Sequence, residues 1–83
     1  MYYVYLLKLD KEFNKEYYIG CTSDLKKRFF QHRKGQVYST KDRNPVLLYY
    51  ESYINKNLAY EREKGLKNSG SVYMALLKRL KLK

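Results

Sequence analysis

The chain has few of the residues on which several kinds of site depend. Its 83 residues include one cysteine, one histidine, one proline and no tryptophan. The single cysteine, Cys21, excludes an internal disulfide framework and suits a reducing compartment, so we expect a cytoplasmic protein. Since only His32 is available as a partner base for a thiol nucleophile, we interpret Cys21 as an inert residue at the end of a strand.

Long hydrophobic runs are also missing. No apolar segment approaches the ~20 residues of a membrane span, and no signal peptide opens the sequence. Any membrane role would therefore rest on charge alone, and we expect no membrane partner.

Acidic residues are scarce as well. Eight Asp and Glu stand against eighteen Lys and Arg, which gives a net charge of +10. This excess is larger than solubility requires and has the sign that attracts phosphate or an anionic surface. It lies from Asp24 onward, and no acid follows Glu63. A solvated basic tail explains the charge run by itself equally well.

The length predicts one domain over residues 1–83, because typical domains have about 100 to 150 residues. Eleven tyrosines dominate its aromatic content, and tyrosine is enriched in strands. Residues 2–9 predict a strand with apolar side chains on both faces, and residues 16–21 predict a second strand after a polar turn over 10–15. The resulting hairpin makes Tyr5 and Tyr18 near neighbours, and Gly20 supplies backbone freedom where the second strand ends.

Residues 25–33 predict a helix that is capped within residues 22–24 and stopped at Gly35. Leu25 and Phe29 form its buried edge, and Arg28 and His32 share one face at the rim of the core. A polar loop over 36–45 and a third strand over 46–54 follow.

Asn55 is the expected cap of a helix over 56–67. Its predicted inner face contains Leu58, Ala59 and Leu66, with Glu63 beside this face and Glu61 pointing outward. After a break at 68–70, an apolar stripe predicts a last helix, with the residues Tyr73, Met74, Leu76, Leu77 and Leu80. The element order is β-β-α-β-α-α, an α+β fold in which helices pack on a three-stranded antiparallel sheet.

Several polar residues match the needs of phosphodiester hydrolysis. The reaction requires a group that orients or deprotonates water, a cation for the developing charge and usually an acid that holds a divalent metal. The candidates, in the same order, are Tyr5, Tyr18 and His32 for the water, Arg28 for the charge, and Glu63 for the metal.

The sequence resembles the GIY-YIG nuclease family over nearly its whole length. The first motif of the family falls on Tyr3-Val4-Tyr5 and the second on Tyr18-Ile19-Gly20. The family arginine and the family acid follow in the same order, at Arg28 and Glu63. Ser39-Thr40 and residues 43–45 are similar to the small stand-alone branch, which is related to the nuclease domain of the bacterial excision-repair incision subunit. Tyr3 stands where the family name has glycine, and its bulk would alter how closely a substrate approaches the first strand.

The resemblance implies a metal-dependent endonuclease. We favour DNA over RNA as its substrate, and we expect weak intrinsic sequence specificity, because cations that hold the nucleic-acid backbone do not read bases. The resemblance also implies one Mg2+ or Mn2+ held by Glu63, a phosphate held by Arg28, and water oriented by Tyr18 with help from Tyr5 or His32. A free phenol, with a pKa near ~10, is a poor base unless nearby positive charge lowers that pKa. The residues expected to hold the nucleic-acid backbone are Lys26, Lys27, Lys41, Arg43, Lys64 and Lys67.

Each site residue also has a structural interpretation. Glu63 is a helix-surface acid that can pair with Lys67 at i+4, Arg28 an ordinary surface cation, and His32 a hydrogen-bonded core histidine; the tyrosines are plain sheet residues. At the level of the whole protein, the alternatives are a nucleic-acid-binding module without useful catalysis and a basic protein that docks on an acidic partner. A protein partner or an oligomer is a further expectation, as a means of targeting.

Overall fold

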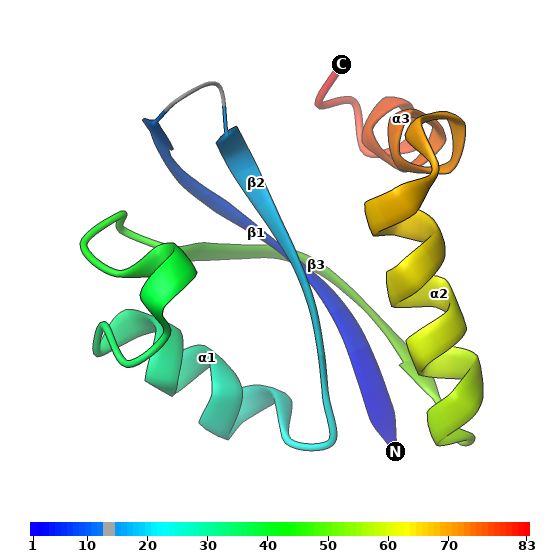
Figure 1. Cartoon of the computed structure of the whole chain (residues 1–83), viewed down its shortest axis with the longest axis horizontal. Coiled ribbons are helices and arrows are strands. Elements are labelled where there is room, and N and C mark those ends of the chain that lie inside the picture. Colours follow the sequence, from blue (N-terminus) through cyan, green and yellow to red (C-terminus); the bar gives the residue numbers. More distant parts are fainter. Residues whose placement is uncertain (13–14) are drawn as a thin grey trace.

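A computed structural model describes residues 1–12 and 15–83 (Figure 1). Its helices and strands follow one another in the order that the sequence predicts. The elements are β1 (Tyr2–Glu12), β2 (Lys15–Thr22), α1 (Leu25–Arg33), the short 3-10 helix η1 (Tyr38–Thr40), β3 (Val46–Tyr53), α2 (Lys56–Asn68) and α3 (Gly70–Arg79). The predicted α+β class and the β-β-α-β-α-α order are therefore confirmed, with η1 added inside the predicted polar loop.

The sheet places β1 at its centre. Its strand order is β2-β1-β3, and both pairings are antiparallel. In register, Tyr5 lies opposite Gly20 of β2 and opposite Tyr50 of β3. Figure 1 shows α1 on one side of the sheet and α2 with α3 on the other. Since both faces of β1 are covered, its apolar residues face two separate cores.

These two cores follow the alternation of side chains along β1. Val4 and Leu6 face α2 and α3, where the core residues are Ile19, Ala59, Leu66, Leu76 and Leu77. Tyr5, Leu7 and Leu9 face the opposite way, toward Leu25 and Phe29 of α1. The predicted two-sided burial of the first strand is confirmed.

The hairpin is longer than the sequence predicts. Asp10–Glu12 and Lys15, which were assigned to a turn, belong to β1 and β2, and residues 13 and 14 of that turn lie outside the described part. Arg43 explains the extension, because its carbonyl accepts from the Asp10 amide at 2.8 Å. The Arg43 guanidinium also donates to the carbonyls of Asp10 and Lys15. These long-range bonds satisfy backbone groups that a polar sequence would otherwise leave to solvent.

The prediction that Leu58 belongs to the inner face of α2 is wrong. Leu58 is 52% exposed, whereas Ala59 and Leu66 are buried. Adjacent helix residues are turned by about 100° from each other, so the face centred on Ala59 and Leu66 carries Leu58 out of the interface. Glu61 is exposed, as predicted. The predicted break before the last helix is also short, because Ser69 follows the last residue of α2 and is the N-cap of α3.

Candidate active site

Three aromatic rings meet on the α1 side of the sheet. Tyr5 comes from β1, Tyr18 from β2 and His32 from α1, with ring centroids 5.1 to 6.3 Å apart. The Tyr5 hydroxyl lies 2.8 Å from His32 Nε2. The structure thus brings together three of the predicted site residues and confirms that Tyr5 and Tyr18 are neighbours.

Gly20 makes room for this cluster. A Cβ at Gly20 would lie 2.3 Å from both Cζ and the hydroxyl oxygen of Tyr5. Our prediction that Gly20 provides backbone freedom at a strand end is wrong, since β2 continues to Thr22 and the only described glycine with positive φ is Gly35. Position 20 must lack a side chain, because the register between β1 and β2 places it directly opposite Tyr5.

His32 lies inside the core rather than at its rim. It is 1% exposed, and its Nδ1 lies 2.7 Å from Thr40 Oγ1. The Thr40 hydroxyl donates to the carbonyl of Val37, so its oxygen is left to accept the Nδ1 proton. Nε2 then accepts the hydroxyl proton of Tyr5. Both ring nitrogens have partners, as the structural interpretation of His32 expects.

Burial controls the protonation of both partners. It lowers the pKa of His32 to about 4, with a further decrease from the charge of Arg28. It also raises the pKa of Tyr5 to about 12, although hydrogen bonding with Arg28 acts in the opposite direction. At neutral pH the pair is therefore a neutral imidazole and a protonated phenol. Tyr5 in this state is a hydrogen-bond donor and a poor base.

Arg28 borders a separate cavity at the start of α1. The cavity has a volume of about 460 Å³, and its other lining residues are Cys21, Thr22, Ser23, Asp24, Lys27 and Gln31. Arg28 Nη1 donates to Gln31 Oε1 at 3.1 Å, and interaction with Tyr5 raises the pKa of the guanidinium. The cavity thus combines a permanently charged fork-shaped donor with a second cation, Lys27, which is a suitable lining for a phosphate.

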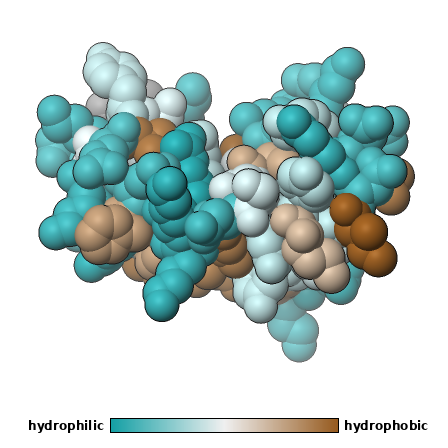
Figure 2. Space-filling model, turned by 90° about the horizontal axis from the view of Figure 1, so that it is seen from below, coloured by the Kyte–Doolittle hydropathy of each residue, from teal (hydrophilic) through white to brown (hydrophobic). Residues whose placement is uncertain are grey.

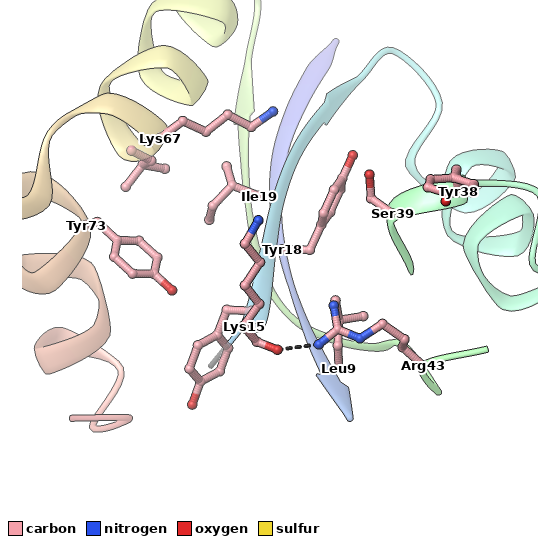
Figure 3. A pocket seen from close by; sticks show the side chains of 11 residues that line it. Leu9, Lys15, Tyr18, Ile19, Tyr38, Ser39, Arg43, Lys67 and Tyr73 are labelled. Carbon is pink, nitrogen blue, oxygen red and sulfur yellow. Dashed lines mark hydrogen bonds between the residues drawn. The ribbon is translucent and has the colours of Figure 1, made fainter. Parts of the chain in front are cut away.

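A larger groove lies on the other side of Tyr18. It has a volume of about 580 Å³ and contains residues from β1, β2, α2, α3 and the segment 38–43. Figure 3 shows Tyr18 in this groove between Lys67 on one side and Ser39 on the other. Lys67 Nζ lies 5.9 Å from the centre of the Tyr18 ring. The surface is also hollowed between the α1 side and the α2 side of the molecule, as Figure 2 shows.

Glu63 lies on α2 beside Lys67, which is the residue that connects it to Tyr18. Its carboxylate lies 3.2 Å from Lys67 Nζ, and its side chain is 22% exposed. The i,i+4 pair that we considered as the structural interpretation of Glu63 is therefore formed. Among the described residues, no group of three or more His, Cys, Asp and Glu side chains is placed to hold a metal. A single carboxylate still fits magnesium, which keeps several waters and takes other oxygens from substrate phosphates.

The residues predicted to hold the nucleic-acid backbone divide into two groups. Lys26, Lys27, Lys41, Lys64 and Lys67 are exposed. Arg43 differs from them, because its guanidinium is engaged with the carbonyls of Asp10 and Lys15. Arg43 thus holds the far end of the hairpin against the loop that precedes β3.

A second cluster, which the sequence patterns did not reveal, fixes α2 on the sheet. Arg62 donates to both carboxylate oxygens of Glu51 at 2.9 and 3.0 Å. The hydroxyls of Tyr49 and Tyr53 donate to the same carboxylate at 2.7 and 2.6 Å. Arg62 directly precedes Glu63, so this cluster anchors the part of α2 that carries the Glu63 carboxylate. The role of Thr40 as a partner of His32 was missed in the same way, because no local spacing connects these residues.

Comparison with known proteins supports the resemblance carried by the motifs. The model of the GIY-YIG catalytic domain matches residues 1–74, and the chain belongs to this family. No curated protein and no solved structure gave a significant match. The family is one of nucleases, so the substrate class is nucleic acid. No helix in the described part of the chain has the length and apolar character needed to cross a membrane.

Proposed function

We propose that this protein is a divalent-metal-dependent endonuclease that hydrolyses DNA with weak sequence specificity and acts in the cytoplasm. The observation that supports this most directly is the position of Tyr18. It lies within ring contact of His32 on one side and of Lys67 on the other, and Lys67 is paired with Glu63. A water orienter, a basic group and a carboxylate thus meet along the edge strand β2.

In this proposal Arg28 holds a non-bridging oxygen of the scissile phosphate and neutralises its developing charge. Tyr18 orients the attacking water, and Tyr5 is held by His32 so that its hydroxyl oxygen faces Arg28. Glu63 would hold Mg2+ or Mn2+, which when bound supplies charge stabilisation and a more acidic water. Exposed lysines contact the backbone without reading bases, which accounts for the weak specificity.

A gel assay on labelled single- and double-stranded DNA and RNA, with Mg2+, Mn2+ or a chelator, tests this function. We expect cleavage of DNA that requires metal and is lost in Glu63→Gln and Arg28→Ala. Glu61→Gln is the matched control, because Glu61 is an exposed carboxylate on the same helix. Cleavage by Glu63→Gln at the rate of the wild-type protein would remove Glu63 from the reaction.

The alternative function is a nucleic-acid-binding module on the same fold. The ion pair of Glu63 with Lys67 favours it, because this contact occupies the carboxylate. A binder is distinguished by affinity that decreases with monovalent salt and is unchanged in Glu63→Gln. The same assay, read for shifted bands without cleavage, separates the two functions.

A further inference from the structure

A third cavity lies on the α1 side, at the end of the sheet where β1 pairs with β3. It has a volume of about 490 Å³. Its walls are aromatic and aliphatic, with Tyr3 and Tyr50 from the strands and Leu25 and Phe29 from α1. The rings of Tyr3 and Tyr50 lie edge to face, with centroids 6.0 Å apart. Tyr50 is 53% exposed, so a large part of its ring is open to a ligand.

The charges at this cavity disfavour a phosphate. Asp24 and Lys26 are the two charged residues among its lining, and their formal charges cancel. The neighbouring cavity around Arg28 contains two cations, Arg28 and Lys27, against the same Asp24. A phosphate is therefore attracted to the Arg28 cavity, whereas a planar uncharged group that stacks on tyrosine suits the other.

The two cavities are adjacent. Asp24 lines both of them. Tyr3 is the register partner of Thr22, which lines the Arg28 cavity. The cavity lined by Tyr3 and Tyr50 is therefore next to the cavity lined by Arg28.

We propose that the cavity between Tyr3 and Tyr50 binds a nucleobase next to the phosphate held by Arg28. This inference rests on the proposed function and deepens it. A base inside a duplex is stacked on its neighbours and cannot enter such a cavity without leaving the helix. The substrate class is therefore nucleic acid with an unpaired nucleotide next to the scissile phosphate. Tyr3 stands where the family name has glycine, so the family motif does not by itself provide the wall of the cavity that Tyr3 forms.

The test measures binding without cleavage, in a chelator and at fixed salt. Fluorescence anisotropy compares a labelled single-stranded DNA oligonucleotide with an abasic oligonucleotide of the same length and charge. Stacking on one aromatic residue contributes enough affinity that Tyr50→Ala should weaken binding of the normal oligonucleotide by about fivefold or more. Binding of the abasic oligonucleotide and of a blunt duplex should not change.

Two variants serve as controls. Tyr60→Ala removes a tyrosine of α2 that is 50% exposed, and it should have no effect. Tyr50→Phe keeps the ring and should bind like the wild-type protein. Equal loss for normal and abasic oligonucleotides in Tyr50→Ala, or no loss for either, would overturn the base site.

Failure of this site is distinguishable from failure of the nuclease proposal. Metal-dependent cleavage together with no base preference would overturn the base site alone. Base-dependent binding through Tyr50 without metal-dependent cleavage would overturn the nuclease proposal alone.

Discussion

At the scale of single residues, Gly20 shows how a short motif depends on a contact across two strands. Substitution by alanine would place a Cβ 2.3 Å from the Tyr5 side chain, so the strand or the phenol must move. We expect Gly20→Ala to lower the free energy of unfolding by roughly 1 to 3 kcal/mol, as overpacking does. Urea denaturation measures this loss.

Gly65 provides the matched control. A Cβ at Gly65 of α2 would meet no atom within 4 Å. Alanine is preferred to glycine in a helix by about 1 kcal/mol, so Gly65→Ala should stabilise the protein. A similar loss of stability in both variants would show that the Tyr5 contact is not what requires a glycine at position 20.

His32 makes stability depend on pH, and the sign follows from its environment. Its pKa is about 4 in the folded protein, compared with 6.5 for an unperturbed histidine. Between these values the unfolded chain binds more protons, so stability is present above pH 6.5 and is lost as the pH falls toward 4. Each pKa unit corresponds to about 1.4 kcal/mol, which limits the loss to roughly 3 kcal/mol.

Denaturation curves at several pH values between 4 and 7 measure this dependence. All carboxylates are the same in the wild-type protein and in His32→Gln, so the comparison between the two isolates the contribution of the histidine. We expect a shallower pH dependence in His32→Gln, with a lower stability at pH 7. Parallel curves for the two proteins would contradict the assigned protonation of His32.

At the scale of elements, the cluster around Glu51 connects the position of α2 to the site. The Glu51 carboxylate accepts from Arg62, Tyr49 and Tyr53, and these bonds lower its pKa despite an opposing effect of burial. Glu51→Gln should reduce the free energy of unfolding by roughly 1 to 3 kcal/mol. It should also raise the Mg2+ concentration needed for cleavage, because Glu63 follows Arg62 directly. Thermal denaturation and a metal titration measure the two effects.

Two further variants make this prediction specific. Glu61→Gln changes an exposed acid of the same helix and should alter stability by less than about 0.5 kcal/mol. The double variant Glu51→Leu with Arg62→Leu replaces the ion pair by apolar groups, which often restores stability. Restored stability with a metal requirement that stays high would show that the cluster orients Glu63. A normal metal requirement in Glu51→Gln would refute that role.

The helices and strands were predictable from local sequence patterns, but the residues at which some of them end were not. The two-faced apolar run of β1, a cap within residues 22–24 and the cap at Asn55 are visible in the sequence, and the structure assigns the first cap to Asp24. The extension of the hairpin depends on Arg43, which reaches the carbonyl of Asp10 across 33 residues. The candidate site divides in the same way. The motifs select Tyr5, Tyr18, Arg28 and Glu63 as candidates, but the hydrogen-bond partners of His32 and Glu51 come from other elements. No spacing within one element reports such contacts.

At the scale of the whole molecule, the net charge of +10 predicts binding that weakens steeply with salt. Each phosphate contact contributes about 0.7 to 0.9 to the slope of log K against log salt concentration. Lys27 is exposed and lines the Arg28 cavity, so Lys27→Ala should reduce the slope by about that amount. Anisotropy titrations between low and high salt, in a chelator, measure it.

Arg43→Ala tests whether charge alone accounts for this dependence. It removes the same formal charge as Lys27→Ala, but the Arg43 guanidinium already donates to two backbone carbonyls of the hairpin. We therefore expect a loss of stability, with a smaller change in the salt slope than Lys27→Ala produces. Equal slopes for the two variants, with stability unchanged in Arg43→Ala, would mean that net charge rather than the placement of individual cations governs nucleic-acid binding.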